Sequence, residues 1–248
     1  MALIRRANNE IAHGEMLAMY ETEVIWGWAT PAGLLRAERR ARLVAEGAGL
    51  QPRVRALEIG CGTGMFTEMW ARTGAQIVGL DISEALLEKA RSRNLPTTQV
   101  QFLAKRFENC DVEGPFDAVI GSSVLHHLDI EAALVKIYGL LKPGGRLSFA
   151  EPNMLNPLVF MERKLAFIRT LFWYVSPDET AYVRWPLRVL LARAGFQELG
   201  LKPFDFLHPA VPRSLIGLVR RVGHRLERTP WLREFAGSLL ICGRRPLF

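Results

Sequence analysis

The chain has 248 residues, and 49% of its side chains are hydrophobic, which is enough to bury a full core. Chains of this length in α/β folds commonly form a single domain, so we expect one main domain. The sequence holds no run of about 18 or more uncharged apolar residues, and its first residues lack the apolar core of a signal peptide. We therefore expect a cytoplasmic protein with no membrane span. The three scattered cysteines predict neither disulfides nor a metal site.

The net charge of +7 is concentrated at the end of the chain. Residues 201–248 hold nine Lys or Arg against three acidic residues, so they account for almost the whole excess. A nearly neutral body with a basic end indicates a local surface or substrate feature rather than a general nucleic-acid binder.

Residues 1–50 are predicted to be mostly helical, with a break at residues 26–33, where the sequence reads WGWATPAG. We expect them to form a helical cap on one domain at residues 51–248. From residue 55 onward, short apolar runs alternate with helix-like segments, which is typical of βαβ units and a parallel sheet. The predicted strands are residues 55–60, 75–81, 99–105, 116–123 and 145–151.

The segments between and after these strands contain residues that are typical of helix starts and helix ends. Ser83 can cap a helix over residues 83–93, whose apolar residues recur at helical spacing. Two later strand-like runs, residues 197–207 and 238–248, are expected to pair as an antiparallel hairpin. Gly195 is expected to close the helix that precedes this hairpin.

Two helical inserts are expected, at residues 153–175 and 208–237. The first is rich in aromatic and aliphatic side chains, and a new helix is expected to start at the capping residue Ser176. The second contains a basic amphipathic helix at residues 213–228. Its two faces consist of Leu215, Leu218, Val219, Val222 and Leu226 on one side, and of Arg220, Arg221, His224, Arg225 and Arg228 on the other. Such a helix either packs on the core or docks on an anionic membrane.

The segment LEIGCGTGMF follows the first predicted strand and opens a helix, and it contains Gly60, Gly62 and Gly64. Glycines at such a turn allow a ligand to lie against bare main chain. A dinucleotide site would have its third glycine one residue later, where Met65 stands.

Two acidic residues lie beside this loop. Glu58 would repel a pyrophosphate but suits the ammonium group of an amino acid. Asp81 ends the second strand, where a carboxylate can accept hydrogen bonds from both hydroxyls of a ribose. The pattern favours a ligand that combines an amino acid with a nucleoside.

Together with FDAVIGSSVLHHL at residues 116–128 and LKPGGRLSF at residues 141–149, these features resemble the class I S-adenosylmethionine (SAM)-dependent methyltransferases. The resemblance covers roughly residues 50–200. It implies a Rossmann-like, mostly parallel seven-stranded sheet flanked by helices. It also implies methyltransferase activity with SAM as the cofactor.

The resemblance assigns cofactor-binding roles to particular residues. Those expected at the methionine end, the loop, the ribose and the adenine are Glu58, Gly60, Cys61, Gly62, Gly64, Asp81 and Ile82. Gly121 and Ser122 match positions that approach the sulfonium. The family often has an Asp after the third strand that binds the adenine amine, but Arg106 stands there. The backbone amide of Phe107 or the carboxylate of Glu108 would replace that contact.

Methyl transfer mainly requires alignment of donor and acceptor, and some acceptors also need a base. His126 and His127 follow the fourth strand, and a neutral imidazole suits a base near pH 7. Glu151 follows the fifth strand and is a third candidate. For all three, the alternative is a structural role.

The acceptor side is less defined. Tyr20 and Trp26, with Trp28, are expected either to form an aromatic lid over the substrate or to pack the N-terminal helix. Asp205 and His208 are weaker candidates. Because both inserts are apolar, we expect a small hydrophobic or amphiphilic acceptor, such as a secondary metabolite, a quinone-like ring, a sugar or a lipid.

Two other functions stay open at this stage. The basic end is the only support for an RNA-modifying methyltransferase, and a SAM-binding protein without activity is the other alternative. The partner that we expect is a small-molecule or lipid-like acceptor, not a nucleic acid. The helix at residues 213–228 would add peripheral contact with an anionic membrane.

Overall fold

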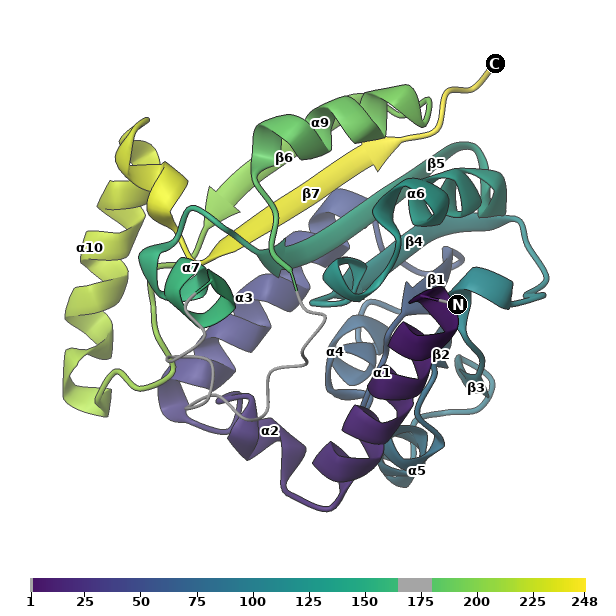
Figure 1. Ribbon diagram of the computed structural model, residues 1–248, viewed down its shortest axis with the longest axis horizontal. Helices are drawn as coiled ribbons and strands as arrows, with labels where there is room; N and C mark the ends of the chain where they lie inside the picture. The colour runs from purple at the N-terminus through teal and green to yellow at the C-terminus, as the bar shows by residue number, and fades with distance from the viewer. Residues whose placement is uncertain (1, 165–179) are drawn as a thin grey trace.

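The computed structural model describes residues 2–164 and 180–248, which form a seven-stranded sheet with helices on both faces (Figure 1). The strands are β1 (Arg55–Ile59), β2 (Gln76–Asp81), β3 (Val100–Ala104), β4 (Phe116–Ser122), β5 (Leu141–Pro152), β6 (Gln197–Phe204) and β7 (Ser238–Arg244). Their order is β3-β2-β1-β4-β5-β7-β6, and β7 runs antiparallel to both of its neighbours. This confirms the predicted α/β, Rossmann-like sheet and its antiparallel C-terminal hairpin.

The helices of the described residues are α1 (Ala2–Ala18), α2 (Thr22–Ile25), α3 (Pro31–Ala48), α4 (Met65–Ala71), α5 (Glu84–Ser92), α6 (Ile130–Leu140), α7 (Pro157–Lys164), α9 (Arg184–Arg193) and α10 (Ile216–Arg228). Short 3-10 turns are η1 (Phe107–Asn109), η2 (Leu125–His127), η3 (Arg213–Leu215) and η4 (Leu232–Phe235). Among these helices, none is both long and apolar enough to cross a bilayer.

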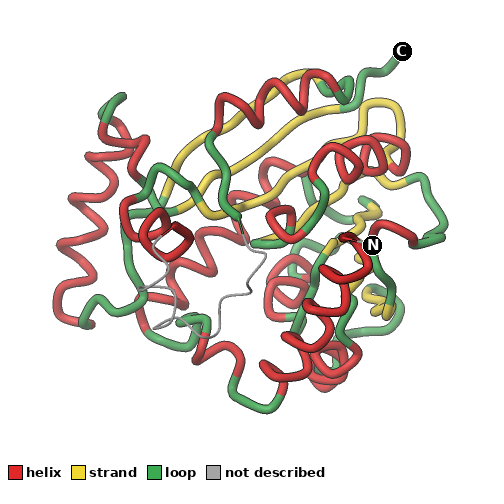
Figure 2. The backbone as a smooth tube through the Cα atoms, in the orientation of Figure 1, coloured by secondary structure: helices red, strands yellow, loops and turns green. Residues whose placement is uncertain are grey.

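Helices lie on both sides of the sheet (Figure 2), and an apolar cluster lies on each face between sheet and helices. On one face, Val44 of α3 and Trp70 of α4 pack with Ile77 and other buried residues of the sheet. On the other face, Leu134 of α6 and Leu187 of α9 belong to the larger apolar cluster. Covering both faces is what a mostly parallel sheet requires, since its strands are apolar on both sides.

The helix start predicted at Ser83 and the helix end predicted at Gly195 are both present. The hydroxyl of Ser83 accepts a hydrogen bond from the N–H of Leu86 at the start of α5. Thr30 caps α3 in the same way, and Pro31 is its first residue, so the WGWATPAG break is a turn between α2 and α3. Gly195 follows Ala194, the C-cap of α9, and has a positive φ of 94°. Such φ values suit glycine, which closes helices at low steric cost.

The inserts lie after β5 and between β6 and β7. The first begins with α7, and the helix start predicted at Ser176 lies outside the described residues. The second contains η3, α10 and η4, so the predicted basic helix is present, with its α-helical part starting at Ile216. β5 begins at Leu141, earlier than the predicted residue 145, because its first residues pair with β4 before a register shift.

Candidate active site

The glycine loop between β1 and α4 has left-handed backbone at all three predicted glycines. Their φ values are 67° at Gly60, 51° at Gly62 and 73° at Gly64. A Cβ atom on Gly60 would lie 2.4 Å from the side chain of Val124, whereas one on Gly62 would meet only Trp26, at 3.6 Å. Gly60 is therefore required by packing as well as by its backbone conformation, and Gly62 faces open space beside Trp26.

A cavity of about 360 Å³ lies beside this loop, at the carboxyl ends of the parallel strands. It is within the size range of ligand sites. Of the predicted site residues, it is lined by Trp26, Gly60, Cys61, Gly62, Asp81, Ile82, Phe107, Ser122, His126 and His127. Helix α1 adds Glu10 and His13 to the wall, and α7 of the first insert adds Glu162 and Arg163.

Five predicted site residues are not part of the cavity wall. Tyr20 is half exposed in the turn between α1 and α2, where its carbonyl oxygen accepts from Lys89. Gly64 precedes α4, and Gly121 lies inside β4, where a Cβ would be 2.7 Å from Phe149. Glu58 and Glu151, the other two, are buried directly behind the wall.

Asp81 fixes the shape of the loop. Its Oδ2 atom accepts from the N–H of Gly62 at 2.7 Å, and its Oδ1 atom accepts from the N–H of Ser83 at 2.9 Å. Burial raises the pKa of Asp81, although these backbone hydrogen bonds act in the opposite direction. The carboxylate lies at the end of β2 in the cavity wall, which is the position expected for a ribose acceptor.

Glu58 is a buried carboxyl group without a cationic partner among the described residues. Its Oε2 atom accepts from the hydroxyl of Thr67 at 2.6 Å. Burial, with the nearby charge of Asp81, raises the pKa of Glu58 to about 8 even though the Thr67 hydrogen bond lowers it. A cation bound nearby would favour the ionised form, as an ammonium group would.

His126 and Glu151 form a buried pair. The Nδ1 atom of His126 lies 2.6 Å from Oε2 of Glu151, and Oε1 of Glu151 accepts from the N–H groups of Val124 and Leu125. Burial raises the pKa of Glu151, but the charge of His126 and these hydrogen bonds outweigh it, so this pKa lies below its usual value. Glu151 thus fixes both the η2 turn and the imidazole ring of His126.

His127 has a different carboxylate neighbour. Its Nδ1 atom lies 3.1 Å from Oε2 of Glu10, which comes from α1. The centres of the two imidazole rings are 4.2 Å apart. Each histidine therefore lines the cavity with a carboxylate beside it. The carboxylate beside His127 is Glu10 of α1, a helix that no sequence pattern connected with the site.

The predicted adenine side is formed by η1 and its flanks. Arg106, Phe107 and Glu108 all line the cavity. The Nε atom of Arg106 lies 3.2 Å from Oε2 of Glu108, so the arginine is paired at the position where the family often has an Asp.

Arg40 is a buried residue that contacts the cavity wall from behind, and no sequence pattern indicates this role. From α3, its guanidinium donates to the hydroxyls of Ser122 at 3.1 Å, Ser123 at 2.9 Å and Ser238 at 2.7 Å, and to the carbonyl of Ala150 at 2.9 Å. Burial lowers the pKa of Arg40 to about 10, so it is charged at neutral pH. Its partners are 82 or more residues away in sequence, so no local pattern indicates the contact.

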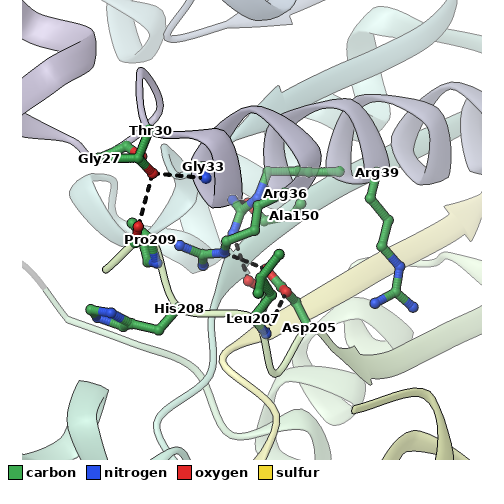
Figure 3. Close-up of polar contacts among 12 residues, drawn as sticks. Gly27, Thr30, Gly33, Arg36, Arg39, Ala150, Asp205, Leu207, His208 and Pro209 are labelled. Atoms are coloured by element: carbon green, nitrogen blue, oxygen red, sulfur yellow. Dashed lines mark hydrogen bonds and ion pairs between the residues drawn. The ribbon is translucent and has the colours of Figure 1, made fainter. Parts of the chain in front are cut away.

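A hydrogen bond and an ion pair join the loop after β6 to the N-terminal part of α3 (Figure 3). The hydroxyl of Thr30 donates to the carbonyl of Pro209 at 2.9 Å, and Nε of Arg36 donates to Oδ2 of Asp205 at 2.7 Å. Burial and the charge of Arg36 lower the pKa of His208. Neither Asp205 nor His208 lines the cavity, and Asp205 holds two elements together.

Comparison with known proteins identifies the family of this chain. A family model described as a methyltransferase domain matches residues 57–147. A ubiquinone biosynthesis O-methyltransferase of Xanthomonas axonopodis pv. citri (strain 306) is 35% identical over 52% of this chain and 56% of its own length. The chain spans about half the length of such relatives.

A demethylmenaquinone methyltransferase of Tropheryma whipplei (strain Twist) is 31% identical over 65% of this chain and 74% of its own length. The solved N-methyltransferase NodS from Bradyrhizobium japonicum WM9, in complex with S-adenosylhomocysteine, has the same fold, with a TM-score of 0.64 and 18% identity. The match covers 96% of this chain and 99% of that one. The chain belongs to the class I SAM-dependent methyltransferases, and SAM is the methyl donor of this family.

Proposed function

We propose that this protein transfers a methyl group from SAM to a small hydrophobic or amphiphilic acceptor with a quinone-like ring. The observation that carries the proposal is the cavity beside the glycine loop, which is lined by Asp81, His126 and His127. The quinone methyltransferases among its relatives support the acceptor class. A cytoplasmic location fits the proposal, and contact with a membrane would bring such an acceptor within reach.

The residues of the cavity fit SAM. Gly62 offers bare main chain, and the Asp81 carboxylate would accept the ribose hydroxyls. Ile82 and Phe107 would enclose the adenine, and Ser122 would lie toward the sulfonium. When bound, SAM supplies an electrophilic methyl group that an acceptor atom attacks in line with the leaving sulfur.

For a hydroxyl acceptor, His126 is the proposed general base. It lines the cavity, and Glu151 lies 2.6 Å from its Nδ1 atom. A carboxylate in this position orients the ring and stabilises the imidazolium that forms when the other nitrogen takes a proton. Glu151 itself is buried, with both oxygens in use, so its proposed role is to position His126. His127 and Glu10 are a second pair at the same wall.

The acceptor would enter between the turn that joins α2 to α3 and the first insert. Trp26 and Trp28 contribute aromatic surface to the cavity wall, and Glu162 and Arg163 come from α7. Tyr20 was predicted to contact the substrate, and its half-exposed side chain outside the wall favours Trp26 for that role.

A transfer assay with methyl-labelled SAM tests the proposal. We expect label in a hydroxylated quinol that carries an apolar tail, and less label in the same ring without the tail. Label in RNA, with none in either quinol, would favour the RNA-modifying alternative. SAM binding without transfer to any acceptor, in a set that includes whole-cell lipid extract, would favour a binding protein.

A further inference from the structure

Helix α10 is attached to the rest of the protein through one side. Ile216 is buried, and Gly223 allows close approach to Phe206, whose Cβ would lie 3.2 Å from a Cβ on that glycine. Glu227 accepts from both terminal nitrogens of Arg39, at 2.6 and 2.7 Å. Because these three α10 positions recur at helical spacing, they share one face, and the opposite face points away from the body. Figure 1 shows α10 at one end of the molecule.

Large apolar side chains remain exposed on α10 and on the turn after it. The exposed fraction is 54% for Leu218, 44% for Val222 and 84% for Trp231, and Leu232 and Phe235 are similarly uncovered. The sequence alone left open whether this apolar face packs on the core. These exposures show that Leu218 and Val222 do not, since a packed leucine is almost completely covered.

Arginines flank the exposed apolar residues. Arg221 and Arg225 follow Leu218 at helical spacing, and Arg220 and Arg228 are also exposed. Within the described part of the chain, none of these four forms an ion pair. Arg221 donates only to the carbonyl of Gly217 in its own helix. The surface therefore combines unneutralised cations with uncovered apolar groups.

We propose that this surface docks on an anionic phospholipid bilayer. We define the α10 face as Leu218, Arg221, Val222, Arg225, Arg228, Trp231, Leu232 and Phe235. Arginine side chains can bind lipid phosphates while leucine and tryptophan enter the interface, and both contributions are needed for reversible binding without a lipid anchor. A second copy of the chain would bring the same positive charges together, and RNA would leave the aliphatic side chains uncovered.

Helix α7 connects the α10 face with the cavity. The side-chain amide of Asn156, just before α7, donates to the carbonyl of Phe235 at 2.8 Å. Near the other end of α7, Glu162 and Arg163 line the cavity. Leu158 and Phe160 of the same helix are exposed as well. Docking does not depend on methyl transfer, whereas delivery of a lipid-like acceptor along α7 rests on the proposed function.

Vesicle flotation without SAM or acceptor tests the docking alone. The full chain is mixed at low salt with phosphatidylcholine vesicles, with or without phosphatidylglycerol. We expect flotation only with phosphatidylglycerol, and loss of flotation in high salt. The variant Arg221→Glu with Arg225→Glu should partition at least about 25-fold less, because each cation near an anionic surface contributes about fivefold. The variant Leu218→Gln with Trp231→Gln should lose at least about tenfold.

Control variants change two exposed arginines and one exposed aliphatic residue elsewhere on the surface. Arg53 and Arg193 are exposed, without ion pairs among the described residues, and Val135 of α6 is 66% exposed. Arg53→Glu with Arg193→Glu, and Val135→Gln, should float like the wild type. Calorimetric binding of S-adenosylhomocysteine by every variant establishes that the body is folded.

Three results would overturn the proposal. One is wild-type protein that stays unbound with anionic vesicles at low salt. Another is equal flotation of the α10-face and control variants. The third is a change from dimer to monomer in the Leu218→Gln, Trp231→Gln variant with unchanged flotation, which would make the face a contact between copies. A failure of methyl transfer would leave all three readouts unaffected.

Discussion

At the scale of single residues, the site contains carboxyl groups with little solvent exposure that hold neighbouring backbone and side-chain groups in place. Asp81 holds Gly62 and Ser83, and Glu151 holds the η2 turn and His126. Glu58 differs from both because, among the described residues, no cation or backbone N–H offsets its burial. Its ionisation should therefore respond most strongly to a bound ligand.

We predict that SAM binding releases a proton from Glu58. With a pKa of about 8 in the free protein, this group is mostly protonated at pH 7, and a nearby ammonium would ionise it. SAM affinity should therefore rise with pH up to about 8, and close to one proton should be released at pH 7. Titration calorimetry in two buffers of different ionisation enthalpy measures the release.

The variant Glu58→Gln should bind SAM without proton release. The substitution should also remove a pH-dependent decrease in the free energy of unfolding. Because the folded-state pKa is raised from 4.5, the folded protein holds more protons than the unfolded chain between pH 4.5 and about 8, so the free energy of unfolding decreases as pH rises. Identical binding heats in both buffers for the wild type would show that Glu58 is not near the ammonium.

A second prediction concerns His126. His126→Ala should lower kcat by about 10²- to 10⁴-fold while SAM affinity stays near the wild-type value, since a base acts in the chemical step. Glu151→Gln should lower kcat less, because the amide keeps part of the contact with the ring. If Glu151 acts only through His126, the double variant should be no slower than His126→Ala alone. If His126→Ala keeps full turnover, methyl transfer depends on the alignment of donor and acceptor and does not use this base.

At the scale of elements, the glycine loop and the helix ends follow from local sequence. Positive φ values occur at Gly60, Gly62 and Gly64, and Ser83 caps α5, as the pattern predicts. The contacts of Arg40 and Glu10 could not be predicted, because their partners come from distant segments that only the folded sheet brings together.

The loop gives a stability prediction with an internal control. Gly60→Ala should destabilise the protein by roughly 2–3 kcal/mol, because it combines unfavourable φ with a contact of 2.4 Å to Val124. Gly62→Ala has the same kind of φ but only an ordinary contact, so it should cost roughly 1 kcal/mol. Urea unfolding measures both values, and equal losses would contradict the packing role of Gly60.

At the scale of the whole molecule, the mostly parallel sheet was predictable because the family motifs occur in chain order, and the antiparallel hairpin was predictable from two strand-like runs near the end of the chain. The acceptor cavity was only partly predictable. The sequence indicated His126 and Trp26, but it also indicated Tyr20, which lies outside the wall, and it gave no sign of Glu162. Caps and inserts come from far apart in the chain, so which of their residues reach the cavity depends on packing and not on spacing.

The central claim is that the cavity beside the glycine loop holds SAM through Asp81. Its most direct measurement is calorimetric titration of S-adenosylhomocysteine and its 2′,3′-dideoxy analogue into the wild type and Asp81→Ala, with NAD as a further ligand. We expect the wild type to bind S-adenosylhomocysteine at one site, to bind the analogue more weakly, and to give no heat with NAD. We expect Asp81→Ala to bind the two adenosyl ligands equally weakly. Wild-type affinity for S-adenosylhomocysteine in Asp81→Ala would contradict this role of Asp81.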